Sequence, residues 1–155
     1  MILVSSCLCG EKCKYNGADN LNLDVVAYIA QKEAIQVCPE VLGGLSTPRI
    51  PAEIVGGSAR DVIEGNAKVM TKEGGDVTMA FINGAHKVLE LAKQFNVQQA
   101  ILKSKSPSCG KGEVYDGCFN NKLIVGNGIT TEILLREGIE VITEVELSQK
   151  AKTLY

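Results

Sequence analysis

Three cysteines follow short apolar runs at widely separated points of the chain. Cys7 comes after the run ILVS, Cys38 directly after AIQV, and Cys109 shortly after AILK. Such runs are typical of buried strands, and Cys109 lies beyond its run in the polar loop SKSPSCG. A structural thiol would normally sit inside the apolar run, because free cysteine packs as a small hydrophobe. The three thiols are therefore candidates for a functional site on loops.

Three thiolates that meet at one place would suit a soft metal ion or an iron-sulfur cluster. Cys9 or Cys13 could supply a fourth ligand. If neither does, one metal position stays open, which is what a metal needs to act as a Lewis acid on a substrate. Groups that could assist acid-base chemistry lie beside these cysteines in the sequence: Glu40, Ser106 and Ser108.

Strands alternate with helices along the chain, which favours an α/β fold with a mainly parallel sheet. The apolar pattern predicts strands over residues 2–5, 34–37, 99–103 and 139–142 and helices over residues 23–32, 76–95, 128–137 and 144–154. We expect a single domain over residues 1–155, with three layers and a Rossmann-like sheet. The carboxyl ends of parallel strands share one edge, where ligands bind, so the three cysteines should meet there.

Residues 42–75 differ from the rest of the chain in being rich in glycine and proline. We expect an excursion that contains a hairpin, with extended segments at residues 52–55 and 67–70. The paired glycines of this region do not fit the spacing of a dinucleotide or phosphate loop, so they are predicted to be turns.

Local signals define the ends of two predicted helices. Asn22 can cap the helix over residues 23–32, with Leu21 and Val26 as a hydrophobic staple and with Val25, Val26 and Ile29 on its inner face. Gly138 should end the helix over residues 128–137.

The composition excludes several classes of function. The 16 basic and 18 acidic residues give a net charge of -2 and are interspersed, which argues against an extended nucleic-acid surface. The N-terminus is apolar for only four residues and has no basic flank, so we expect neither a signal peptide nor a membrane span. A cytoplasmic protein with six cysteines uses them for metal or redox chemistry more often than for disulfides.

Five motifs together resemble the family once called domain of unknown function 523, which is associated with thiouracil desulfidases. The motifs are VSSCLCGEKCKYNG, VCPEVLGGLSTPRIPAEI, GGDVT, LKSKSPSCG and VYDGCF. They occur in order over nearly the whole chain, and the three that contain Cys7, Cys38 and Cys109 are specific as a set.

The resemblance implies an enzyme that removes sulfur from a thiolated pyrimidine, or a related small thiocarbonyl compound, without redox chemistry. It implies a [4Fe-4S] cluster held by Cys7, Cys38 and Cys109, whose free iron takes the sulfur, with Glu40 and Ser106 moving protons or orienting the substrate. The chain departs from the usual first motif, CLLG, because Cys9 replaces a leucine. This adds a thiol that could compete for the fourth iron. No oligomeric state follows from the sequence.

Two other functions remain open at this point. The same three cysteines could hold zinc for hydrolysis, or Cys9 and Cys13 could serve a sulfur carrier or redox sensor that is not an enzyme.

Several other residues also have more than one interpretation. Glu40 can cap a turn, and Ser106 and Ser108 are common turn residues. Arg49 either anchors a carboxylate or meets the substrate. Two further residues are expected to stay outside the ligand set, Cys118 and His86.

Overall fold

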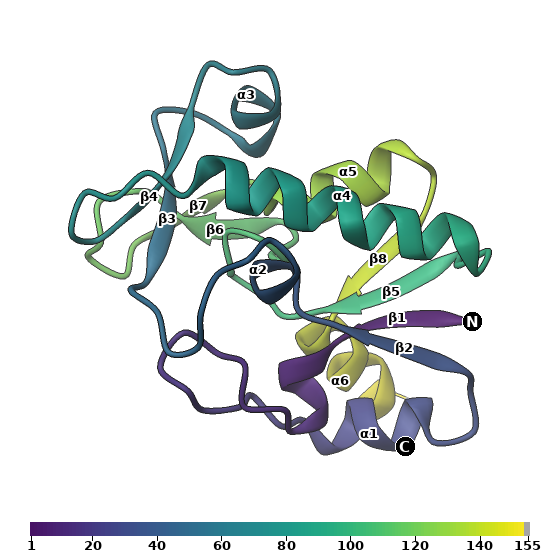
Figure 1. The fold of residues 1–155 in the computed structure, drawn as a ribbon. Coiled ribbons are helices and arrows are strands. Elements are labelled where there is room, and N and C mark those ends of the chain that lie inside the picture. The colour runs from purple at the N-terminus through teal and green to yellow at the C-terminus, as the bar shows by residue number, and fades with distance from the viewer. Residues whose placement is uncertain (154–155) are drawn as a thin grey trace.

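The computed structural model of the protein describes residues 1–153 and has a parallel four-stranded sheet at its centre (Figure 1). The strands are β1 (Ile2–Ser5), β2 (Ala34–Val37), β5 (Gln99–Leu102) and β8 (Glu140–Thr143), in the spatial order β2-β1-β5-β8. All three neighbouring pairs are parallel. The predicted α/β fold with a mainly parallel sheet is therefore confirmed.

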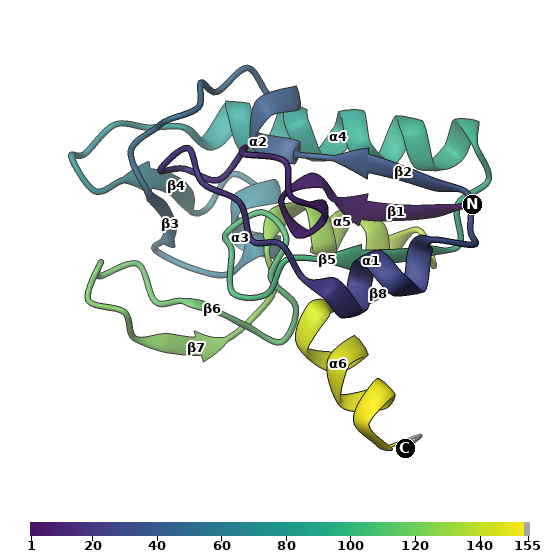
Figure 2. The same ribbon diagram turned by 90° about the horizontal axis from the view of Figure 1, so that it is seen from below.

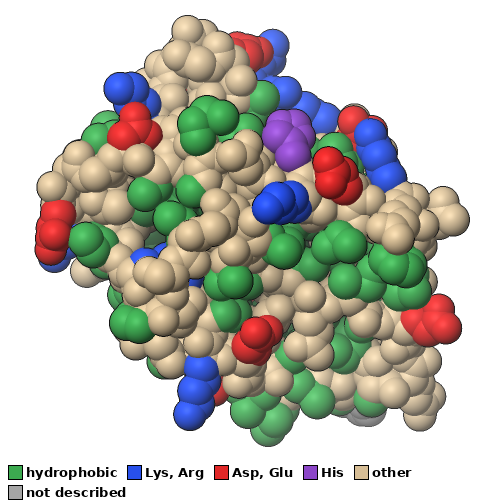
Figure 3. Space-filling view, in the orientation of Figure 1, with side chains coloured by type: hydrophobic (Ala, Val, Ile, Leu, Met, Phe, Trp, Pro, Cys, Tyr) green, Lys and Arg blue, Asp and Glu red, His purple; other side chains and the backbone are tan. Residues whose placement is uncertain are grey.

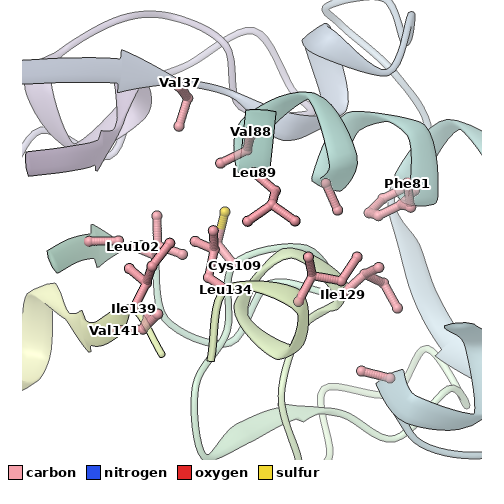
Figure 4. Packing of buried hydrophobic residues seen from close by; sticks show 14 of the residues in the cluster. Val37, Phe81, Val88, Leu89, Leu102, Cys109, Ile129, Leu134, Ile139 and Val141 are labelled. Carbon is pink, nitrogen blue, oxygen red and sulfur yellow. The ribbon is translucent and has the colours of Figure 1, made fainter. Parts of the chain in front are cut away.

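Helices cover both faces of this sheet, which gives the three predicted layers (Figures 1 and 2). Helices α4 (Thr78–Gln94) and α5 (Ile129–Arg136) lie on one face, and α1 (Leu23–Ile29) and α6 (Glu144–Thr153) on the other. Alternate residues of β1 enter the two resulting cores, since Leu3 faces the first pair of helices while Ile2 and Val4 face the second. Figure 4 shows the packing of the larger core beneath α4.

The excursion between β2 and α4 contains the predicted hairpin. Strands β3 (Ala52–Val55) and β4 (Lys68–Thr71) pair antiparallel, and the short helices α2 (Pro39–Leu42) and α3 (Ala59–Ile63) flank β3 in the chain. A second hairpin, formed by β6 (Glu113–Tyr115) and β7 (Leu123–Val125), and the 3-10 helix η1 (Ser6–Cys9) complete the elements. The helices α2, α3 and η1 and the second hairpin were not predicted, because three to five residues are too few to show a periodic pattern.

The predicted first helix is wrong in its extent and partly in its buried face. Asn22 caps it as expected, since its Oδ1 accepts a hydrogen bond from the Val25 backbone at 3.1 Å. The helix ends at Ile29, however, and only Val25 is fully buried, while Leu21 is 52% and Val26 37% exposed. A helix of two turns has room for few inward positions, so the proposed staple stays at the surface. The last predicted helix runs through Thr153, and residue 154 lies outside the described part of the chain.

Acidic and basic side chains are interspersed on the face shown in Figure 3. The single histidine, His86, is exposed on α4, as expected for a surface residue of a helix. No helix within residues 1–153 is long and apolar enough to cross a membrane.

Two glycines let α2 approach α4 at backbone distance. A Cβ atom on Gly84 would lie 2.0 Å from the Pro39 carbonyl oxygen, and one on Gly43 would lie 2.0 Å from the Ala80 carbonyl oxygen. We expect Gly84→Ala to lower the free energy of unfolding by about 1–3 kcal/mol, because α2 must move away. Urea denaturation measures this change. The exposed neighbour offers a control, since Asn83→Ala should change stability by less than about 0.5 kcal/mol; equal effects of the two changes would contradict the close-packing argument.

Candidate active site

A cavity of about 760 Å³ lies where the chain leaves the carboxyl ends of β1, β2 and β5. The central strand, β1, has β2 on one side and β5 on the other, so the connections that follow β1 and β5 diverge here. This is the place where open α/β sheets bind ligands. The opening is visible as a hollow between α2 and β3 in Figure 3.

Four thiols line this cavity: Cys7, Cys13, Cys38 and Cys109. Cys7 belongs to η1, which turns the chain immediately after β1. Cys38 is the N-cap residue of α2, and Pro39 begins that helix with the fixed φ that suits a first position. The structure thus brings together the three cysteines that the strand pattern singled out, and it adds Cys13.

The loop that carries Cys109 is shaped by serine and threonine side chains. Ser106 Oγ accepts hydrogen bonds from the backbone N–H groups of Ser108 (3.1 Å) and Cys109 (2.8 Å). Thr131 Oγ1 donates to the Cys109 carbonyl oxygen at 2.8 Å. Cys109 belongs to the larger core (Figure 4), although it also lines the cavity. Ser106 therefore positions Cys109 and keeps its own hydroxyl proton free to donate.

Of the two cysteines that could supply a fourth ligand, Cys13 is the one that lies with the other three thiols. Cys13 lines the cavity with Cys7 and Cys38, and the Cys38 thiol lies 3.9 Å from the Cys13 carbonyl oxygen. The hydrogen bond from Cys13 is the main cause that lowers the pKa of Cys7 to about 7, and it also lowers the pKa of Cys38. The pKa of Cys13 is raised because it holds the shared proton, and burial raises that of Cys109. A thiol binds metal as a thiolate, so Cys7 and Cys38 are nearest to the ligating state.

Glu40 and Arg49 form an ion pair at the wall of the cavity. Arg49 Nη2 lies 3.1 Å from Glu40 Oε2, and the two side chains are only 12% and 14% exposed. Arg49 Nη2 also donates to the Cys13 carbonyl oxygen at 2.9 Å, and Cys38 Sγ lies 3.4 Å from the same Glu40 oxygen. Of the two interpretations of Arg49, anchoring a carboxylate is the one that the geometry shows. Arg49 thereby ties the excursion to the loops of Cys13 and Cys38.

A second ion pair, which the sequence did not indicate, lies at the start of the loop that follows β5. Lys103 Nζ lies 3.1 Å from Glu144 Oε1. The same carboxylate accepts hydrogen bonds from the Ser104 backbone N–H at 2.8 Å and from the Ser104 hydroxyl at 2.5 Å. Lys103 and Ser104 begin the loop that leads to Cys109, so the first residue of α6 fixes where that loop starts.

Removal of this carboxylate should cost more than the loss of an ordinary surface ion pair. Because the Glu144 side chain is only 9% exposed, Glu144→Ala leaves Lys103 half-buried without its partner. We expect the free energy of unfolding to fall by about 3 kcal/mol, measured by urea denaturation. Glu137→Ala, which removes the exposed Lys93–Glu137 pair, should cost less than about 1 kcal/mol. Similar losses in the two variants would show that the Glu144 network contributes nothing special.

The remaining candidates lie outside the cavity lining. Cys9 and Cys118 are not among its residues, and Cys118 is exposed. Ser108 is buried and hydrogen-bonded to Thr130 Oγ1 at 3.1 Å, which makes it part of the loop framework. Cys13, unlike Cys9, lines the cavity together with Cys7 and Cys38.

Comparison with known proteins identifies the class to which this fold and site belong. Residues 2–146 match the model of the 2-thiouracil desulfurase family, so the chain is a member of that family. It is 49% identical to the Bacillus subtilis (strain 168) "Uncharacterized protein YbbK" over 148 residues, which cover 96% of this chain and 98% of the relative. It also resembles the solved structure of the [4Fe-4S]-dependent thiouracil desulfidase TudS (DUF523Vcz), with a TM-score of 0.84, 39% identity, and coverage of 99% of this chain and 96% of that one.

The chemistry of the donors fits an iron-sulfur cluster better than a single ion. No three cysteine, histidine, aspartate or glutamate side chains within residues 1–153 surround one point closely enough to hold one metal ion. A four-iron cluster is larger than an ion, so its thiolate ligands stand farther apart, and thiols from three different loops around one cavity suit it.

Proposed function

We propose that this protein releases sulfur as sulfide from a thiolated pyrimidine or a related small thiocarbonyl compound, and that it does so with a [4Fe-4S] cluster. The observation that carries the proposal is the convergence of Cys7, Cys38 and Cys109 on one cavity that also contains Glu40 and Ser106. Family membership and the likeness to TudS support the same reaction.

The three thiols are the proposed ligands, each from a separate loop. When bound, a cluster with three protein ligands supplies an iron with an open coordination position, a Lewis acid for the thiocarbonyl sulfur. Cys13 is not needed as a fourth ligand. Its single S–H group can donate a hydrogen bond to a ligating Cys7 or Cys38 sulfur.

The chain's own acid-base groups complete the site. Glu40 is proposed to move a proton to the ring nitrogen or from the attacking water, and Arg49 orients its carboxylate. Ser106 is proposed to orient the substrate through its hydroxyl proton, because its oxygen is already occupied by two backbone donors. The cavity of about 760 Å³ has space for the substrate beside a cluster.

Anaerobic reconstitution with iron and sulfide tests the proposal. We expect a brown protein with about four iron atoms and four acid-labile sulfides per chain, and sulfide release from 2-thiouracil under single-turnover and multiple-turnover conditions. A protein that takes up iron but releases no sulfide from thiolated pyrimidines would overturn the proposed reaction. A colourless protein that takes up no iron would overturn the proposed cofactor.

A further inference from the structure

Glu53 is a buried carboxylate that the proposed reaction leaves without a role. It lies in the middle of β3, is only 9% exposed, and lines the same cavity as the four thiols. None of the ion pairs within residues 1–153 includes it. Burial of a carboxylate without a counter-charge costs free energy. The groups that hydrogen-bond to Glu53 therefore indicate its role.

Within residues 1–153, hydrogen bonds reach only one of the two Glu53 oxygens. Oε1 accepts hydrogen bonds from the backbone N–H groups of Gly117 at 2.9 Å and Phe119 at 3.2 Å. A carboxylate offers about four acceptor positions on two oxygens. For Oε2 the described part of the chain supplies no donor. Since Glu53 lines the cavity, Oε2 is left as an acceptor for a molecule inside it.

The segment held by Oε1 brings aromatic side chains to the cavity. Phe119 and Tyr115 both line it. Phe119 has a φ of 57°, which a bulky residue rarely adopts, and its hydrogen bond to Glu53 fixes that backbone. A Cβ atom on Gly117 would lie 2.5 Å from the Ile54 carbonyl oxygen, so this loop is seated directly on β3.

The second hairpin also lies beside the loop of the proposed acid-base residue. An isolated bridge joins Lys105 to Val114, which places Tyr115 and its neighbours alongside Ser106. The cavity therefore has thiols in one part and, continuous with Ser106, a wall that combines a free carboxylate oxygen with aromatic rings. A flat heterocycle with an N–H group is the ligand that such a wall fits, because aromatic rings pack against its face and the carboxylate accepts its proton.

We propose that Glu53 Oε2 accepts a hydrogen bond from a ring N–H of the thiolated heterocycle, and that the site thereby selects thiocarbonyl rings with an N–H at that position. Glu53 is a specificity-determining residue in this scheme and is distinct from Glu40, which moves protons. The inference rests on the proposed function, because it requires that the thiolated ring binds in this cavity.

Glu53→Gln is a sharp test because the loop constrains how the new amide can sit. The two backbone N–H groups require the amide oxygen at the Oε1 position, so the NH₂ group must replace Oε2. The loop of Gly117 and Phe119 therefore keeps its hydrogen bonds, while the acceptor at the Oε2 position is replaced by a donor. The control is Glu73→Gln, which removes the same charge from an exposed position outside the cavity lining.

The experiment compares 2-thiouracil with 1-methyl-2-thiouracil and 3-methyl-2-thiouracil, using reconstituted wild-type, Glu53→Gln and Glu73→Gln proteins of equal iron content. We expect Glu53→Gln to lower kcat/KM for 2-thiouracil about 10- to 100-fold, mainly through KM. One methyl isomer should be a similarly poor substrate of the wild type, and Glu53→Gln should change its kcat/KM less than about 3-fold. The two effects are then non-additive, as expected when both changes remove one hydrogen bond. Glu73→Gln should match the wild type.

Equal losses for all three compounds in Glu53→Gln, or none, would overturn the inference. The inference would also be overturned if the wild-type protein had the same kcat/KM for both methyl isomers as for 2-thiouracil. This outcome can be measured without any variant. Calorimetric binding of the same compounds separates the inference from the proposed function. If no compound releases sulfide but 2-thiouracil binds about 10- to 100-fold more weakly to Glu53→Gln, the reaction is overturned and the inference stands; equal binding by both proteins overturns the inference.

Discussion

Replacement of Cys38 by alanine should abolish binding of the iron-sulfur cluster. Cys38 caps α2 at the cavity wall, and a cluster with three protein ligands cannot lose one thiolate without losing most of its anchorage. Cys7→Ala should act in the same way. We expect iron content after anaerobic reconstitution to fall from about four atoms per chain to less than about one, and the visible absorbance to disappear.

Cys109 requires a smaller change, because its sulfur also fills the core. Cys109→Ala leaves a void in the larger core, so the near-isosteric Cys109→Ser separates loss of ligation from loss of packing. Urea denaturation of each variant shows whether the fold is retained.

Matched cysteine controls identify the ligand set. Cys118→Ala and Cys9→Ala remove thiols that do not line the cavity, and both should bind iron like the wild type. Cys13→Ala should retain the cluster while losing a thiol that can donate a hydrogen bond to a ligating sulfur, which a shifted visible spectrum would report. A Cys38→Ala protein with full iron content, or a Cys13→Ala protein with none, would contradict the assignment.

The sequence was sufficient for the central sheet because each strand is a short apolar run next to a turn or cap. Once the parallel order was inferred, the positions of Cys7, Cys38 and Cys109 directly after strands placed them at one edge, where the structure has the cavity. The prediction depended on strand direction, which βαβ alternation supplies, and on the order of the strands, which places β2 and β5 on either side of β1. The strand after α4 was one residue too long in the prediction, since β5 ends at Leu102.

The contacts that complete the site were beyond the sequence because they join residues far apart in the chain. Lys103 and Glu144 are 41 positions apart in the chain. Each of them, considered separately, predicts an ordinary charged residue at the surface. Glu53 sits in a short strand, where a single carboxylate predicts a solvent-facing position, yet its partners come from a hairpin that the sequence did not show. Cys13 lies in an irregular loop, and no periodic pattern indicates where its side chain points.

Glu40→Gln should separate cluster binding from turnover. The amide is nearly the same size as the carboxylate, and its oxygen can still accept the hydrogen bond from Arg49 Nη2, now 3.1 Å away. Iron content and the visible spectrum should therefore stay close to those of the wild type. An amide cannot accept and return a proton at the substrate, so we expect kcat for sulfide release to fall at least about 100-fold, the usual effect of removing a general acid or base.

Arg49 supplies the comparison that decides whether Glu40 acts directly. Arg49→Lys keeps a positive charge beside Glu40 but cannot reproduce the contacts that the guanidinium makes with both Glu40 and the Cys13 carbonyl. We expect a smaller loss of kcat, about 10-fold, because the proton-transfer group is still present but less well oriented. If Glu40→Gln instead loses the cluster, its carboxylate holds the site together. If it keeps both cluster and wild-type turnover, the proton must move through another group, and Ser106 becomes the residue to replace next.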